Sequence, residues 1–242
     1  MLSKNTIKLI TSLKQKKYRY QHRLFVVEGK KTILEFLASD FVLESLYTVV
    51  DLGIDQQQFI TEKELQRISF LKNTNSALAI FKFKKEESIE QSGLIIGLDN
   101  IRDPGNLGTI IRLCDWFGVT QLLCNKETVD CFNPKVVQAT MGSLTRVNVS
   151  YLDLKTFLKG YKKTVYGTFM SGESIYSMEG RIEDGLVIMG NEANGISEEV
   201  EQFINYKISI PRFGKSQLTE SLNVATATAI TLSELKRKAI EM

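Results

Sequence analysis

Apolar residues recur along this chain in two alternating patterns. Short uninterrupted apolar runs, such as residues 24–27 and 94–98, alternate with stretches in which apolar residues return every third or fourth position. Uninterrupted runs are typical of strands covered on both faces, and the wider spacing is typical of amphipathic helices. The pattern therefore predicts an α/β protein whose second half contains a largely parallel sheet.

The first third of the chain has enough of this alternation for a small α/β domain. We expect helices over 5–17 and 32–37, a third helix that Thr61 opens, and strands over 24–27, 46–50 and 77–83. The segment 82–93 is polar and charged, which makes it the best linker candidate. We therefore place a first domain over 1–84, a linker over 85–93 and a second domain over 94–242.

In the second domain, strands are expected over 94–98, 119–123, 146–149, 164–170, 186–189 and 207–210. Asp103 followed by Pro104 is a strong helix start, and this helix should run to about Phe117 and end at Gly118. Further helices are expected over 133–141, 154–158, 198–204 and 221–238. Strands and helices thus alternate to the end of the chain, as in open α/β sheets.

The composition is that of an ordinary soluble globular protein, with 43% hydrophobic and 24% charged residues among 242. No apolar run approaches the roughly 20 residues of a membrane span, and the first residues lack the apolar core of a signal peptide. Three cysteines, an odd number without CxxC spacing, are expected to be reduced and structural. We expect a cytoplasmic protein.

Charge is unevenly distributed along the chain. Residues 1–31 carry nine Lys or Arg against one acid, Glu28, whereas residues 93–242 hold 16 basic and 17 acidic residues. A basic start on a neutral body favours a polyanionic partner such as nucleic acid, although a solvated helix face is the alternative. Aromatic groups able to stack on bases interleave with the cluster. The candidates for RNA contact are Lys16, Lys17, Arg19 and Arg23.

Three polar clusters follow predicted strands of the second domain, at residues 100–112, 190–195 and 210–223. Ligand-binding loops of an open α/β sheet lie at the carboxyl ends of its strands, so these clusters predict one composite site. In the first cluster, backbone N–H groups at a helix start and the Arg112 guanidinium favour an anion such as phosphate. The alternative is a cap at Asp103, a turn at Asn106 and a surface charge at Arg112.

The second cluster places Glu192 between Gly190 and Gly195, where glycines permit either close ligand approach or simply a tight turn. No GxGxxG supports a dinucleotide site, and no HExxH motif or Cys/His cluster supports a metal site. The only histidine is His22, which excludes a histidine general base from the second domain. An enzyme built on these clusters would have to use Arg, Glu, Asn and Ser.

These motifs resemble those of the SpoU (TrmH-like) branch of the SPOUT methyltransferases across the whole chain. The family pattern falls on Asn100, Asp103, Asn106, Gly108 and Arg112, on Gly190, Glu192 and Gly195, and on Ile210, Pro211, Gly214 and Ser221-Leu222-Asn223-Val224. Ala225 departs from the serine that is common at its position. The run from Lys16 to Gly29 resembles a substrate-binding domain of the ribosomal-protein-L30e-like fold.

The resemblance implies a SPOUT domain with a C-terminal trefoil knot, a homodimer built around that knot, and S-adenosylmethionine as methyl donor. It implies donor contacts from Gly190, Glu192, Ile210, Pro211, Leu222 and Asn223, and a polar active site of Asn106, Arg112, Glu192, Ser221 and Asn223. Arg112 would also contact the RNA, mainly as a clamp on a phosphate, because a guanidinium stays protonated.

The activity implied by the resemblance is methylation of a ribose 2′-hydroxyl in RNA. Ribosomal RNA is the expected substrate, because the N-terminal domain resembles the type fused to ribosomal RNA modifiers. Three alternatives remain open: a transfer RNA 2′-O-methyltransferase, a base methyltransferase, and an RNA-binding homologue that has lost catalysis.

Overall fold

The structure is a computed structural model that describes residues 1–85, 87–178, 182, 184–214 and 221–237. Internal contacts divide the chain into two compact units. The first comprises Met1–Glu86 and Asp130–Thr145, and the second comprises Glu87–Val129 and Arg146–Met242. Residues 130–145 thus pack with the first unit, although the boundaries expected from the sequence include them in the second domain.

The first unit contains a mixed sheet in the order β1-β4-β2-β3. Its strands are β1 (Leu24–Glu28), β2 (Leu43–Thr48), β3 (Gln57–Phe59) and β4 (Ala77–Lys82). Strand β4 pairs antiparallel with both β1 and β2, and β2 pairs parallel with the edge strand β3. The helices are α1 (Lys4–Ser12), α2 (Lys16–His22), α3 (Lys30–Leu37), α4 (Glu62–Ile68) and α6 (Pro134–Thr140). Thr61 opens α4 with a capping box, which confirms the predicted start.

The single helix expected over 5–17 is wrong, because α1 ends at Ser12 and α2 begins at Lys16. The buried guanidinium of Arg19 donates from Nη1 to the carbonyls of Leu13 at 2.9 Å and Lys14 at 2.8 Å. These bonds satisfy carbonyls that a continuous helix would have used internally. The Arg19 side chain, from α2, therefore stabilises the break between the two helices.

An aromatic cluster explains why residues 130–145 belong to the first unit. Phe132, which directly precedes the cap of α6, lies 4.6 Å from Phe25 of β1 and 4.1 Å from Phe83 between ring centroids. All five residues of β1 are buried, as expected for a strand covered on both faces. The segment 130–145 supplies part of this cover.

The second unit contains a six-stranded sheet in the order β10-β8-β9-β5-β6-β7, and every pair in it is parallel. Its strands are β5 (Leu94–Leu98), β6 (Gln121–Cys124), β7 (Asn148–Tyr151), β8 (Val165–Ser174), β9 (Gly185–Met189) and β10 (Tyr206–Ser209). The parallel sheet predicted from the apolar runs is confirmed.

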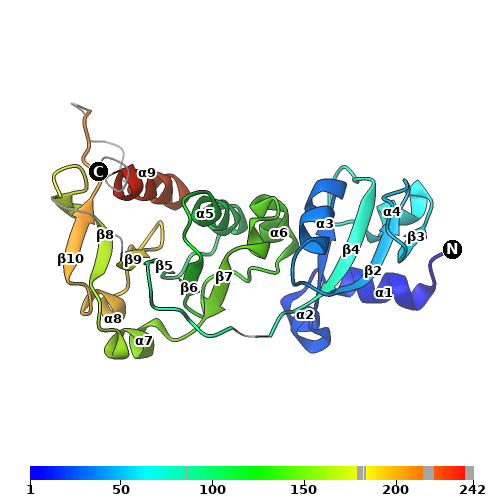
Figure 1. Ribbon diagram of the computed structural model, residues 1–242, viewed down its shortest axis with the longest axis horizontal. Helices are drawn as coiled ribbons and strands as arrows, with labels where there is room; N and C mark the ends of the chain where they lie inside the picture. The colour runs from blue at the N-terminus through cyan, green and yellow to red at the C-terminus, as the bar shows by residue number, and fades with distance from the viewer. Residues whose placement is uncertain (86, 179–181, 183, 215–220, 238–242) are drawn as a thin grey trace. The chain divides into compact units, whose positions relative to one another are not determined.

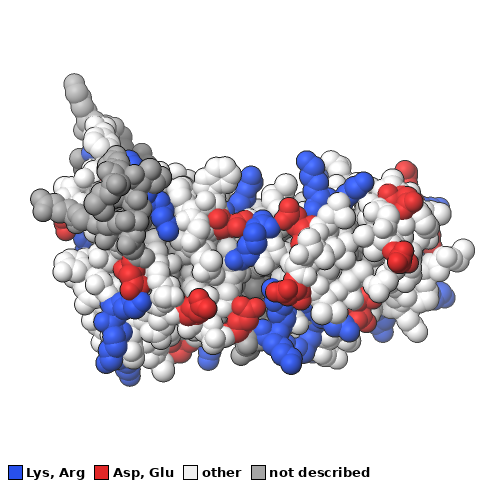
Figure 2. Space-filling model, in the orientation of Figure 1, with Lys and Arg blue, Asp and Glu red and all other residues white. Residues whose placement is uncertain are grey.

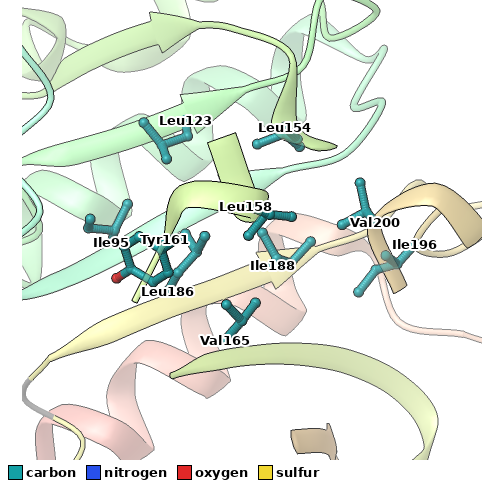
Figure 3. Packing of buried hydrophobic residues seen from close by; sticks show 10 residues of the cluster. All are labelled: Ile95, Leu123, Leu154, Leu158, Tyr161, Val165, Leu186, Ile188, Ile196 and Val200. Carbon is teal, nitrogen blue, oxygen red and sulfur yellow. The ribbon is translucent and has the colours of Figure 1, made fainter. Parts of the chain in front are cut away.

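Helices cover both faces of this sheet (Figure 1). Helices α5 (Pro104–Trp116) and α9 (Val224–Arg237) pack together on one face, and α7 (Leu154–Gly160) and α8 (Glu198–Glu201) pack together on the other. Figure 3 shows the core under α7 and α8, where Leu154, Leu158 and Val200 meet strand residues such as Ile95 and Ile188.

Asp103 caps α5 and Pro104 is its first residue, as predicted. The predicted end of α5 is also confirmed, since Gly118 has a φ of +67°.

All three cysteines are buried free thiols, as expected. Burial raises the pKa of the Cys114 thiol to about 12, so this thiol is protonated and unreactive at neutral pH. Among the helices of the described residues, none is long and apolar enough to cross a membrane.

Candidate functional site

The three polar clusters begin where β5, β9 and β10 end. The first cluster runs from β5 into α5, the second follows β9, and the third leads from β10 toward α9. Because all strands of this sheet are parallel, their carboxyl ends lie at one edge. The parallel arrangement thus brings together polar residues that are more than 100 positions apart in the sequence.

A buried carboxylate fixes the loops behind the site. Asp99, which is 2% exposed, accepts hydrogen bonds from Asn125 Nδ2 at 2.8 Å and from the backbone N–H of Ser197 at 2.7 Å. Asn191 Nδ2 donates to the carbonyl of Asn100 at 2.7 Å. These bonds join the loops after β5, β6 and β9. Charged and amide groups beneath the surface therefore fix the positions of the loops that form the site.

Sequence reasoning missed Asp99, Asn125 and Asn191 as residues of the site. The available signal was an acid directly after the apolar strand 94–98. Such a residue begins a loop at the carboxyl end of a strand, where positioning groups are expected.

One amide connects the three clusters. Asn106, in the first turn of α5, donates from Nδ2 to Oε1 of Glu192 and accepts from Nδ2 of Asn223 at 2.8 Å. We call this arrangement the Asn106 bridge. Asn223 in turn accepts from the N–H of Thr226 in the first turn of α9. The predicted residues Asn106, Glu192 and Asn223 are thus in direct contact, and each comes from a different cluster.

A cavity of about 710 Å³ lies beside the bridge. Six of the predicted site residues line it: Gly190, Glu192, Ile210, Pro211, Ser221 and Leu222. Asn223 does not line it, because its side chain points to Asn106. The walls combine apolar residues such as Met189 and Ile208 with the residues of the turn 190–195. Both the size and the mixed lining are typical of small-molecule sites.

Gly190 is required by the turn itself. A Cβ there would lie 2.3 Å from the backbone carbon of Gly195, because Asn191 and Gly195 exchange two backbone hydrogen bonds. The tight-turn alternative therefore accounts for the glycine, and the same turn also forms part of the cavity wall. In the first cluster, Asp103 acts as the cap of α5 through its bond from the N–H of Asn106 at 2.8 Å.

Arg112 lies apart from this cavity. It is exposed on α5 and lines a second groove of about 680 Å³ between α5 and α9, together with Thr109, Trp116 and Ile230. Within the described part of the chain, no hydrogen bond or ion pair holds its guanidinium. The structure therefore leaves Arg112 available for an external anion, and keeps it out of the cavity wall.

The predicted RNA-contact residues of the first unit separate into two groups. Lys16, Lys17 and Arg23 are exposed, and basic side chains gather over α2 (Figure 2). Arg19 is only 1% exposed and forms an ion pair with Asp130 at 2.6 Å, so the prediction that it contacts RNA is contradicted by its burial. The helix period explains this, since Arg19 lies on the inward face of α2.

The exposed basic side chains lie against aromatic rings. The ammonium of Lys16 lies 5.5 Å from the ring centre of Tyr20, and the guanidinium of Arg23 lies 5.9 Å from that of Phe83. Burial, followed by the charge of Asp130, raises the pKa of the Tyr20 hydroxyl well above its usual range. The Tyr20 hydroxyl is therefore neutral, and the side chain already contacts Asp130 and Lys16 of the same unit.

Fold and site together define an α/β protein that presents a composite ligand site at the carboxyl edge of an all-parallel sheet. The model of the SpoU rRNA Methylase family matches residues 93–233, and that of the MRM3-like substrate binding domain matches residues 4–79. The chain belongs to the SpoU rRNA methylase family.

Among curated proteins, the chain is 27% identical to the 23S rRNA (guanosine(2553)-2'-O)-methyltransferase RlmP of Bacillus subtilis, with 93% of each chain covered. It is 30% identical to the 23S rRNA (guanosine-2'-O-)-methyltransferase RlmB of Neisseria meningitidis, over 64% of this chain and 62% of that one. The match to the first relative therefore extends over both units.

Solved structures give the same result. A Porphyromonas gingivalis structure assigned to the TrmH family of RNA methyltransferases is 36% identical, with a TM-score of 0.89 and 98% and 99% of the two chains covered. An AdoMet-bound rRNA methyltransferase from Sinorhizobium meliloti is 28% identical, with a TM-score of 0.86 and coverages of 98% and 96%.

Proposed function

We propose that this protein transfers a methyl group from S-adenosylmethionine to a ribose 2′-hydroxyl in ribosomal RNA. The observation that carries the proposal is the Asn106 bridge beside the cavity, in a chain that belongs to the SpoU rRNA methylase family. Similarity over 93% of both chains to an enzyme named for 23S rRNA 2′-O-methylation favours ribosomal over transfer RNA.

The cavity suits this methyl donor. Apolar side chains such as Ile175 and Ile208 can cover a nucleoside, and the polar turn 190–195 with Glu192 can meet the charged end of the donor. The hydroxyl of Thr231, which lines the cavity, is buried without a hydrogen-bond partner among the described residues. Residues Gly190, Glu192, Ile210, Pro211 and Leu222 would hold the donor, and Asn223 would act from beside it.

When bound, the donor supplies a methyl group on a cationic sulfur. The residues of this chain then have to bind, orient and polarise the acceptor. Asn106 sets the orientations of Glu192 and Asn223, and Ser221 adds a hydroxyl at the cavity wall. Arg112 would clamp a phosphate next to the target ribose and stabilise developing negative charge on the 2′-oxygen. Its permanent charge suits this role better than that of a base.

The first unit would bind the RNA through the exposed basic face of α2, which includes Lys16, Lys17 and Arg23. Family models that match residues 4–79 and 93–233 support a division into a substrate-binding domain over 1–84, a linker and a methyltransferase domain over 94–242. A Lys16→Glu, Lys17→Glu double variant should weaken RNA binding and reduce its salt dependence by about two counterions. Lys159→Glu, Lys162→Glu on the exposed surface of the second unit is the matched control.

We also propose a homodimer formed through the second unit, knotted at its C-terminal end as in the family, in the cytoplasm. The support for the dimer is Trp116, the chain's only tryptophan, which is 82% exposed beside Arg112 and α9. In the proposed dimer the partner subunit covers Trp116, and dissociation returns it to water. Dilution should therefore shift the tryptophan emission to longer wavelength at the concentration where sedimentation shows dissociation. A monomer at all concentrations would contradict the dimer.

The decisive experiment measures methyl transfer. The purified protein, with tritiated S-adenosylmethionine, is given ribosomal RNA or transfer RNA from cells that lack the gene, and the product is digested to nucleosides. We expect a 2′-O-methyl nucleoside from ribosomal RNA alone. Label in transfer RNA, or in a methylated base, would replace the substrate or the reaction proposed here. Donor binding without transfer to either RNA would favour an RNA-binding homologue without catalysis.

A further inference from the structure

The hydroxyl of Thr231 has no hydrogen-bond partner in the described structure, although the side chain is buried on α9. Thr231 is 1% exposed, and its Oγ1 is one of two buried side-chain polar atoms without a partner among the described residues. An unsatisfied buried hydroxyl is destabilising, and native structures contain few of them. Such an atom at the wall of a cavity indicates a partner that comes from outside the chain.

A threonine within a helix normally has a partner at hand, the carbonyl four residues earlier. Thr228, on the same helix, uses it and donates to the carbonyl of Val224 at 2.8 Å. Thr231 does not make the corresponding bond. A valine would fill nearly the same volume without an orphan hydroxyl, so packing alone does not account for threonine at this position.

The position of Thr231 along α9 places it in the cavity. Val224, Ala227 and Thr231 all line it, at the i, i+3 and i+7 spacing of one helix face. Val224 follows Asn223 of the Asn106 bridge, and seven residues of helix span about 10 Å. Methyl transfer is proposed to occur near the bridge. Thr231 therefore lines the part of the cavity that is remote from the reacting methyl group.

We propose that the Thr231 hydroxyl forms a hydrogen bond with the adenosine part of the methyl donor. The inference rests on the proposed function, which places the reacting methyl group near the bridge. A hydroxyl on a side chain that is only 1% exposed suits an uncharged group such as the nucleoside better than the charged amino-acid end, whose desolvation would be costly. Thr231 is thus a binding residue of this site that the three sequence motifs do not include.

The test uses Thr231→Val and Thr231→Ser in the full-length protein, with Thr228→Val as the matched control. Titration calorimetry measures affinity for S-adenosylhomocysteine and for 5′-methylthioadenosine, which lacks the amino-acid end. In Thr231→Val, both affinities should fall about three- to ten-fold, the equivalent of one hydrogen bond. Thr231→Ser and Thr228→Val should bind as the unsubstituted protein does.

Thermal unfolding without ligand provides an independent readout. Thr231→Val should be at least as stable as the unsubstituted protein, because it removes an unsatisfied hydroxyl, whereas Thr228→Val loses a formed bond. Unchanged affinity of Thr231→Val for both ligands would overturn the inference. Weaker binding of S-adenosylhomocysteine alone would also overturn it, since the hydroxyl would then face the amino-acid end. Failure of the unsubstituted protein to bind either ligand would instead overturn the proposed function, and the inference with it.

Discussion

Asn223 donates from its Nδ2 to Oδ1 of Asn106 at 2.8 Å, across 117 positions of sequence. The other end of the Asn106 amide donates to Glu192, so one planar group fixes the orientation of two side chains. Asn106 is itself anchored by its backbone N–H, which bonds the Asp103 carboxylate at 2.8 Å. The helix cap and the polar site are thus connected through a single residue.

Replacing Asn106 should therefore impair catalysis more than donor binding. We expect Asn106→Ala to lower the methyl-transfer rate about 100-fold through misplacement of Glu192 and Asn223, and to lower donor affinity by a smaller factor of about ten, because Glu192 also takes part in holding the donor. Single-turnover kinetics and calorimetry measure the two quantities. Asp103→Asn, which keeps a good helix cap, is the control and should stay near the unsubstituted rate. Full activity of Asn106→Ala would remove the bridge from the mechanism.

Arg112 provides a second separation of binding from turnover. Because its side chain lines the groove between α5 and α9 and not the cavity, Arg112→Ala should abolish transfer and leave the affinity for S-adenosylhomocysteine unchanged. Arg112→Lys keeps the charge but loses the planar fork, so it should restore only part of the rate. A loss of donor affinity equal to the loss of turnover would contradict the assignment to RNA.

The sequence predicted those features that local signals determine. Asp103-Pro104 and Gly118 mark both ends of α5, and uninterrupted apolar runs indicate the strands of a parallel sheet. The composite site was also predictable, because parallel strands place their carboxyl ends together. The short edge strand β3 was missed, since the residues Gln57–Phe59 carry no apolar run.

Features that depend on distant partners were not predictable. Arg19 looked like one of several basic residues in a surface run, and its partner Asp130 lies 111 positions away. The same guanidinium also bonds the carbonyls of Leu13 and Lys14 between α1 and α2. Asp99 and Asn191 position the site through loop contacts that no motif includes. Local patterns give periodicity and caps, whereas these roles follow from tertiary packing.

The Arg19–Asp130 pair leads to a prediction about stability. Both side chains are 2% exposed, so removing one partner leaves a buried charge, and Arg19→Met should cost about 3–5 kcal/mol. The exposed pair between Lys82 and Glu44 in the same unit is the control, and Lys82→Met should cost at most about 1 kcal/mol. Urea unfolding measures both changes. Similar costs for the two variants would mean that the buried pair adds nothing beyond a surface contact.

Replacing the Asp130 carboxylate by a neutral amide should recover much of the unfolding free energy that Arg19→Met loses. In Arg19→Met, Asp130→Asn, no unpaired charge remains, so we expect the double variant to be more stable than Arg19→Met alone. An additive result, with each substitution costing the same in either background, would show that the two side chains do not interact energetically.

Glu28 predicts how stability depends on pH. Its carboxyl is 5% exposed at the end of β1, and burial raises its pKa, although bonds from Ser69 and the N–H of Phe70 oppose the rise. A carboxyl whose folded pKa is raised stabilises the fold below its unfolded pKa, and this contribution is lost as pH rises through the folded value.

Glu28→Gln stays neutral and can still accept from Phe70 and donate to Ser69. Its gain in unfolding free energy over the unsubstituted protein should therefore be larger at pH 7.5 than at pH 4, as measured by urea unfolding at both values. A gain that is larger at pH 4 would show that the charged carboxylate is the form that the folded protein favours.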